Sequence, residues 1–228
     1  METENRIKVY NVIILDKSGS MSSIAKQAID GVNETIASIK RNQEKHPERD
    51  NRITLVAFCG CEIKKIYEQA PVGEVRPITS ADYRPCCMTP LYDAIGNTIT
   101  SVHHMMEGDS NAIASVTIIT DGYENDSKEF SHTAIKSLIE AYKSEGWLFA
   151  YIGAEHDVEA VAFNLSIDNH MAFEKSEKGV RRMFSKFSLS RDRYLEEVVS
   201  TMSDASMDAD QKRNVLRSNS INFFNEEE

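Results

Sequence analysis

The sequence predicts an α/β fold with a doubly wound, mostly parallel central sheet, one antiparallel edge strand and additional C-terminal helices. Two observations predict it. Short, almost uninterrupted apolar runs alternate along the chain with segments of helical periodicity, as expected for strands that helices bury on both faces. Two of these runs end directly before an aspartate, Asp16 and Asp121, and open sheets of this kind bind ligands at the carboxyl ends of their strands.

The first part of the chain predicts a strand, a helix and a hairpin. Residues 9–15 form the first buried strand, and Ser22 or Ser23 is expected to cap the amphipathic helix that follows. Residues 53–59 form a second buried strand, and residues 61–68 form a more polar strand that pairs with it. Because of its polarity, the second member of this hairpin is expected at the sheet edge, antiparallel to its neighbour.

The next helix follows a loop that contains several prolines. Thr89 is the expected N-cap and Pro90 the first helical residue, and an apolar stripe then continues to residue 106. Residues 115–120 form a third buried strand, which leads directly into Asp121. This half of the chain therefore repeats the strand and helix alternation of the first.

The remaining elements complete the same pattern. Asp126 and Glu129 have the spacing of a capping box and predict the start of another helix. A strand at residues 147–152, a short helix at residues 158–163 and a brief strand at residues 170–173 follow. This alternation favours a single sheet with helices on both faces.

The chain divides into three predicted parts. Residues 1–174 form the α/β domain, and residues 175–204 contain two runs of helical periodicity that predict a helical extension packed on it. Residues 205–228 form a polar tail whose composition allows disorder. Phe223 and Phe224 interrupt that tail, and they either dock on the chain's own domain or form a linear motif for a partner.

Composition narrows the function classes. The 228 residues, 41% of them hydrophobic, suit a globular domain that needs no disulfides. The formal net charge of −10 disfavours binding to nucleic acid or to anionic membranes, because both attract positive surfaces. The N-terminus lacks a secretory signal, and no apolar run approaches the ~20 residues of a membrane span. We therefore expect a cytoplasmic protein with reduced cysteines.

Polar residues at the predicted strand ends indicate a cation site. Asp16 is followed at alternate positions by Ser18 and Ser20, and Asp121 ends another strand. Carboxylate and hydroxyl oxygens are the ligands that hard divalent ions such as Mg²⁺ prefer. Two carboxylates only balance the charge of such an ion, so it stays electrophilic and leaves a position for an incoming anionic oxygen.

Three segments together resemble a known metal site. They are Asp16-x-Ser18-x-Ser20, Thr89-Pro-Leu-Tyr-Asp-Ala-Ile and Ile119-Thr-Asp121-Gly. They resemble the metal-ion-dependent adhesion site of the von Willebrand factor type A (VWA) domain, in order along the chain. The resemblance implies a Rossmann-like VWA fold with a complete site, of the type found in cytoplasmic bacterial and phage proteins.

The resemblance also implies a role for each residue. Ser18 and Ser20 are expected to bind the ion directly, and Asp16 and Asp121 through water. Thr89 is expected to bind directly in an open state and through water in a closed one. Mg²⁺ is the default ion, with Mn²⁺ or Ca²⁺ as alternatives.

The implied function is a binding module without catalysis. Such a module docks a protein partner when the bound metal coordinates a Glu or Asp carboxylate of that partner. Loops at residues 82–90 and 122–127 are expected to supply specificity, with Glu124, Glu155 and His156 as candidates for the rim. Cytoplasmic members of the family are often accessory or adaptor subunits, which makes an AAA+ ATPase or an operon-encoded protein a candidate partner.

Two other function classes stay open. A Mg²⁺-dependent phosphohydrolase can also begin with an aspartate at a strand end, but the second acid of the haloacid dehalogenase pattern is replaced here by Ser18. The sequence also lacks a Gly-rich phosphate loop. A self-assembling scaffold would instead use the C-terminal tail, including the carboxylates of residues 226–228, to control access to the site.

The four cysteines are the least expected feature of this sequence. Cys59 and Cys61 flank the predicted hairpin turn, and Cys86 and Cys87 lie just before Thr89, so the fold can bring all four together. Cys-x-Cys combined with Cys-Cys is not the usual spacing of zinc ligands. A zinc site, a redox sensor and small buried side chains all stay open as interpretations.

Overall fold

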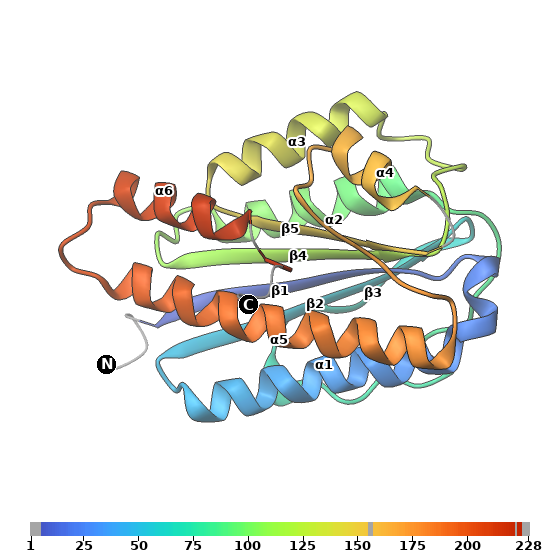
Figure 1. The fold of residues 1–228 in the computed structure, drawn as a ribbon, viewed down its shortest axis with the longest axis horizontal. Coiled ribbons are helices and arrows are strands. Elements are labelled where there is room, and N and C mark those ends of the chain that lie inside the picture. The colour runs from blue at the N-terminus through green and yellow to red at the C-terminus, as the bar shows by residue number, and fades with distance from the viewer. Residues whose placement is uncertain (1–5, 155–156, 222, 225–228) are drawn as a thin grey trace.

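The computed structural model describes residues 6–154, 157–221 and 223–224, and it confirms the expected fold class (Figure 1). Its strands are β1 (Ile7–Asp16), β2 (Arg49–Cys59), β3 (Glu62–Pro71), β4 (Ala112–Thr120), β5 (Leu148–Gly153) and β6 (Asn169–Ala172). They form one six-stranded sheet in the order β3-β2-β1-β4-β5-β6. The pairing is parallel throughout except at β3, which runs antiparallel to β2 at one edge.

Helices cover both faces of the sheet. They are α1 (Ala25–Lys45), α2 (Leu91–Met106), α3 (His132–Ser144), α4 (Val158–Asn164), α5 (Glu177–Ser203) and α6 (Ala209–Ser220), with short 3₁₀ turns at Gly19–Ile24 and Val72–Glu74. Figure 1 shows α1 and α5 side by side below the sheet and α2, α3 and α4 above it. None of the helices in the described ranges combines the length and apolar content that a membrane span requires.

Each face of the sheet has its own apolar core. In β1, Ile13 and Leu15 pack into the core between the sheet and helices α1 and α5. Val12 and Ile14 pack into the core between the sheet and helices α2 and α3. Successive residues of a strand point to opposite faces, so a strand covered on both sides is apolar at most successive positions. This explains why the central strands read as continuous apolar runs.

The close packing of α1 against α5 depends on a glycine. A Cβ atom at Gly31 would lie 2.0 Å from the ring of Phe184, which is well inside van der Waals contact. Any larger residue at this position would force the two helices apart. The long C-terminal helix is thus fitted closely to the face of the α/β domain.

Two helix starts differ from the expectation. Ser22 and Ser23 do not cap α1, because they lie in a 3₁₀ turn and the α-helix begins only at Ala25. Helix α2 begins at Leu91 with Pro90 as its N-cap, one residue later than expected. The polar residues of both loops are therefore available for contacts other than capping.

The start of α3 also differs. Asp126 and Glu129 do not form a capping box, and the chain between Asp121 and α3 is irregular. The helix begins at His132, where the side chain of Ser131 accepts a hydrogen bond from the backbone of Ala134. The spacing of the acids misled the prediction because other residues bind them, as described below.

The C-terminal extension is one helix rather than two. The apolar side chains of Phe187 and Tyr194 are both buried, and they are two helical turns apart, so one continuous helix keeps them on the same face. The tail differs too, because Asp208 and Gln211 form a capping box that begins α6. The boundary between residues 174 and 175 stays a prediction.

The apolar island of the tail docks on the chain's own domain. Phe223 and Phe224 are both buried, and the backbone N–H of Phe223 donates a 3.1 Å hydrogen bond to Oδ1 of Asn169. This is the first of the two alternatives that the sequence left open. Residues 226–228, whose carboxylates the scaffold hypothesis used, lie outside the described residues.

Candidate metal centre

The two aspartates singled out in the sequence lie at the same edge of the sheet. Strands β1 and β4 are parallel neighbours, with Leu15 paired to Ile119. Asp16 is the last residue of β1, and Asp121 directly follows the last residue of β4. Because parallel strands end at one edge, the fold places both acids there, as expected.

Asp16 is fully buried and held at both carboxylate oxygens. Oδ1 accepts a 2.6 Å hydrogen bond from the backbone N–H of Ser18, and Oδ2 accepts a 2.6 Å bond from the hydroxyl of Thr120. Burial raises the pKa of Asp16, and the nearby charge of Asp121 adds to this effect, whereas the hydrogen bonds oppose it. A buried carboxylate of this kind is stabilised by a neighbouring cation.

Two hydroxyls and the second carboxylate form a chain of oxygens beside it. Oγ of Ser18 lies 3.1 Å from Oγ of Ser20, which donates a 2.5 Å hydrogen bond to Oδ1 of Asp121. Adjacent ligands of an octahedral Mg²⁺ ion are about 3.0 Å apart, since each lies about 2.1 Å from the ion at right angles. The spacing and chemistry of these oxygens fit a hard divalent cation.

The other oxygen of Asp121 faces a cation of the chain itself. Oδ2 is buried and accepts no well-directed hydrogen bond from the described residues, but it lies 2.7 Å from Nζ of Lys175. The side chain of Asp121 is fully buried and that of Lys175 is 12% exposed. Lys175 follows β6, far along the chain, so no local pattern marked it as part of the site.

Thr89 is connected to the loop after Asp121 by hydrogen bonds of its backbone. It is buried, its N–H donates a 2.8 Å hydrogen bond to Oδ1 of Asn125, and its carbonyl accepts a bond from the N–H of Asn125. Two residues earlier, the carbonyl of Cys87 accepts a 3.0 Å bond from Gly19. The Thr89 loop therefore contacts both other loops of the site, while metal binding by its hydroxyl stays a prediction.

Two further acids organise the loop after Asp121. Asp93, near the start of α2, accepts hydrogen bonds of 2.8–2.9 Å from the backbone N–H groups of residues 128, 129 and 130. Glu124 accepts bonds from the backbone of Tyr92, Asp126 and Ser127. Glu124 thus ties the loop to α2 and is not a free rim residue.

The remaining rim candidates were Glu155 and His156, and both lie outside the described residues. Two exposed apolar side chains stand instead next to predicted ligands. Met88, which precedes Thr89, is 51% exposed, and Tyr123, which follows the Asp121-Gly122 pair, is 55% exposed. They belong to the two loops that were expected to supply specificity.

A tyrosine that no sequence motif indicated contacts the backbone of Asp16. The hydroxyl of Tyr83 donates a 2.6 Å hydrogen bond to the backbone carbonyl of Asp16. The turn that carries Tyr83 is held by Asp82, which accepts bonds from Arg76 and from the backbone N–H of Thr79. The ion pair with Arg76 and the bond from Thr79 hold the pKa of Asp82 well below its usual range.

This depressed pKa predicts an acid-dependent loss of stability. An unfolded aspartate titrates near pH 3.9, so the contribution of Asp82 is fully present above about pH 4 and is lost as the pH falls further. We expect Asp82→Asn to lower the Tm at neutral pH, with a difference from the wild type that shrinks below about pH 4. Thermal unfolding of both proteins across this range checks it, and a constant difference would contradict it.

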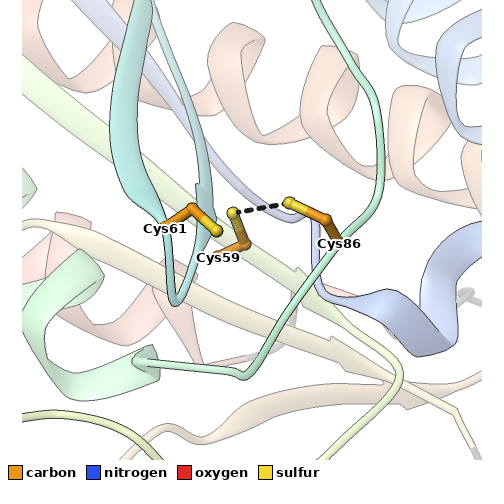
Figure 2. Close-up of side chains that lie close together, drawn as sticks. All are labelled: Cys59, Cys61 and Cys86. Atoms are coloured by element: carbon orange, nitrogen blue, oxygen red, sulfur yellow. Dashed lines mark hydrogen bonds between the residues drawn. The ribbon is translucent and has the colours of Figure 1, made fainter.

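The cysteines converge as the sequence suggested. Figure 2 shows Cys59 and Cys61 on the hairpin and Cys86 on the facing loop, with Sγ of Cys59 3.4 Å from Sγ of Cys86. A hydrogen bond from the thiol of Cys87 lowers the pKa of Cys61, and the interaction with Cys59 raises the pKa of Cys86 to about 12. The thiols of Cys59, Cys61 and Cys86 lie within 4.8 Å of one another, and Cys87 is the next residue after this group.

No protein-family model and no curated protein matches the chain, but its fold is similar to solved structures. The pilus adhesin SpaC from Lactobacillus rhamnosus GG aligns with a TM-score of 0.61 at 12% identity, covering 85% of this chain and 31% of the adhesin. The mussel byssus protein PTMP1 aligns with a TM-score of 0.52 at 12% identity, covering 81% of this chain and 46% of PTMP1. The chain thus spans less than half of either protein.

A shorter structure matches over nearly its whole length. The VWA domain of SpRpn10 aligns with a TM-score of 0.56 at 10% identity, covering 79% of this chain and 94% of that domain. Similarity at this level of identity concerns the fold. The sheet order, the single antiparallel edge strand and the helices on both faces agree with it. The chain therefore has the Rossmann-like fold of the von Willebrand factor type A domains.

Proposed function

We propose that this chain is a protein-binding module that uses a bound divalent cation, Mg²⁺ by default, to engage a carboxylate of its partner. Asp16, Ser18, Ser20, Thr89 and Asp121 would hold the ion, directly or through water. The chain would act without catalysis. The ion, when bound, would supply a coordination position for an anionic oxygen from outside the chain.

One observation carries this proposal. The oxygens of Ser18, Ser20 and Asp121 lie 2.5–3.1 Å from their neighbours beside the buried carboxylate of Asp16. Two buried carboxylates near one another repel, so a cation between them would lower the electrostatic free energy of the site. In the described structure Lys175 provides part of that compensation, and a divalent cation would provide more.

The surroundings of the site support a protein as the partner. Met88 and Tyr123 present exposed apolar surface on two sides of the predicted ligands. Interfaces commonly place such side chains around a charged contact, where they exclude water. The fold is also similar to that of part of a pilus adhesin and of the VWA domain of SpRpn10. An accessory or adaptor role in the cytoplasm, with an AAA+ ATPase or an operon-encoded partner, is the finer form of this proposal.

The geometry favours binding over phosphoryl transfer. A nucleophilic aspartate must present a free oxygen to its substrate, but both oxygens of Asp16 accept hydrogen bonds and the residue is fully buried. The check is an assay with a generic phosphate ester and Mg²⁺. Turnover that Asp16→Asn abolishes would refute the binding-module proposal.

A pull-down tests the proposed function. Tagged wild-type protein is compared in Mg²⁺, in EDTA, and in EDTA followed by excess Mg²⁺, alongside Ser18→Ala. The matched control is Ser23→Ala, because Ser23 is exposed in the neighbouring 3₁₀ turn. Partners should be lost in EDTA, regained with Mg²⁺, absent with Ser18→Ala and retained with Ser23→Ala. Partners that bind equally with and without Mg²⁺ and also bind the Ser18→Ala protein would contradict the proposal.

Lys175 gives a separate prediction about metal affinity. Its ammonium group competes with any bound cation for the carboxylate of Asp121. We expect Lys175→Met to increase the affinity for Mg²⁺ by about tenfold, because the metal would no longer be repelled by a nearby positive charge. Calorimetric titration checks this against Lys178→Met, which removes an exposed charge at the start of α5. Equal or weaker affinity in Lys175→Met would refute it.

A further inference from the structure

Three of the four cysteines of the chain meet at one place beside the candidate metal centre, and the fourth is the next residue along. The Sγ atoms of Cys59, Cys61 and Cys86 lie within 4.8 Å of one another (Figure 2). The fourth cysteine, Cys87, directly follows Cys86 and lies outside this group of three. All four are free thiols. A cluster of three thiols from two separate loops, with a fourth cysteine adjacent in sequence, has the composition of a thiolate metal site.

The distances suit a tetrahedral ion. A Zn–S bond is about 2.3 Å, so two sulfur ligands of tetrahedral Zn²⁺ are about 3.8 Å apart. The observed separations, 3.4 Å between Cys59 and Cys86 and no more than 4.8 Å within the trio, lie around that value. A disulfide would need a contraction to about 2.05 Å and would use only two of the four thiols.

The backbone at Cys87 supports a role for its side chain. Cys87 has a φ of +61°, in the left-handed region that costs a residue other than glycine about 1–2 kcal/mol. Glycine would fit this position with less strain. A cysteine at this position places a fourth thiol directly after Cys86, next to the group of three.

The surroundings also fit the charge and the access that such an ion needs. Four thiolates around Zn²⁺ carry a net charge of −2, and the buried ammonium of Lys17, which pairs with Glu62, also interacts electrostatically with Cys59 and Cys86. Cys59 is buried, which shields one side of the cluster, whereas Cys61 and Cys87 are exposed. An ion can therefore enter from solvent without opening the fold.

We propose that Cys59, Cys61 and Cys86 bind a Zn²⁺ ion, with Cys87 as the fourth ligand once its side chain turns toward them. Each thiol releases its proton to solvent on binding, so one Zn²⁺ and four thiols give a tetrathiolate dianion and four protons. The ion would fix the loop before Thr89 to the hairpin between β2 and β3. Because the carbonyl of Cys87 also bonds to Gly19, the zinc would stiffen the frame of the neighbouring oxygen site without taking part in it.

Cobalt substitution and zinc competition test this site on the full chain under reducing conditions. The wild type should bind one Zn²⁺ per chain, and Co²⁺ in its place should show tetrahedral ligand-field bands with a thiolate-to-cobalt charge-transfer band. Cys61→Ser and Cys87→Ser change exposed residues and should keep the fold, yet each should weaken Zn²⁺ binding about a hundredfold or more. Ser18→Ala should keep the cobalt spectrum, which separates this site from the oxygen site.

Three results would overturn the proposal. The first is a reduced wild type that gives no charge-transfer band with Co²⁺. The second is unchanged zinc affinity in Cys61→Ser and Cys87→Ser. The third is a protein, purified with zinc but without reductant, that has lost two hydrogens to a disulfide between Cys59 and Cys86 and holds no zinc. Four thiols that become reactive only after a chelator is added would support it.

Discussion

Replacing Asp16 by asparagine is expected to abolish the stabilisation by Mg²⁺ while leaving the metal-free protein at least as stable as the wild type. Burial is the main cause that raises the pKa of Asp16, so its charge is costly in the metal-free protein and a neutral amide relieves that cost. The hydroxyl of Thr120, which now donates to Oδ2, can rotate to accept from the amide. Asp16→Asn should therefore lose only the stabilisation that Mg²⁺ binding adds.

The size of this effect follows from linkage. At a free Mg²⁺ concentration about a hundred times Kd, binding adds about 2.7 kcal/mol to the free energy of unfolding. The Asp16→Asn protein should lose this added stability, because its site holds one carboxylate instead of two and no longer binds Mg²⁺ tightly. Urea unfolding with and without Mg²⁺ measures it, with Ser23→Ala as a control that keeps the full increment. An Asp16→Asn protein that Mg²⁺ still stabilises equally would contradict the assigned role.

Replacing Asp93 by alanine is expected to cost about 3 kcal/mol of stability, because its carboxylate accepts charge-assisted hydrogen bonds from three backbone N–H groups. Asp93 is only 7% exposed, so water cannot easily replace the lost acceptor. The substitution would also free the loop that follows Asp121, so the affinity for Mg²⁺ should fall with the stability. Urea unfolding and calorimetric titration measure the two effects.

A matched control separates this role from a general loss of charge. Asp30 is 57% exposed and pairs with Lys26 one helical turn away, so Asp30→Ala removes the same group where it contributes little. We expect a change within about 0.5 kcal/mol for that variant. Equal destabilisation by the two substitutions would show that the hydrogen bonds of Asp93 do not hold the loop.

The fold and the position of the candidate site could be predicted because each depends on local patterns. Continuous apolar runs marked strands buried on both faces, and two of those runs led into Asp16 and Asp121. Parallel pairing then placed both acids at one edge whatever the details of the loops. The spacing of Ser18 and Ser20 after Asp16 added the hydroxyls of the same loop.

The parts that could not be predicted depend on contacts between distant segments. Lys175 reaches Asp121 from more than fifty residues later in the chain, and Asp93 binds the backbone of a loop more than thirty residues later. Asp126 and Glu129 had the spacing of a helix cap, but α3 begins after them because Glu124 and Asp93 hold this loop in an irregular conformation. Local propensity gives way to such tertiary hydrogen bonds.

The cysteines lie between these two cases. The sequence allowed the pairs at Cys59 and Cys86 to meet, because a hairpin turn and a loop at one sheet edge are neighbours in this fold. Their spacing matched no usual zinc motif, so the distances between the thiols were needed to distinguish a metal site from scattered small residues. Spacing along the chain describes ligands of one loop well and ligands shared between two loops poorly.

The central claim is that the oxygens of Asp16, Ser18, Ser20 and Asp121 hold a divalent cation. Electron paramagnetic resonance with Mn²⁺ tests it most directly, because Mn²⁺ substitutes for Mg²⁺ at oxygen sites, disfavours thiolates, and loses its free-ion signal on binding. The wild type should remove one Mn²⁺ per chain from the free signal, and Asp16→Asn and Ser18→Ala should each remove far less at the same concentrations. Equal Mn²⁺ binding by the wild type and both variants would contradict the claim.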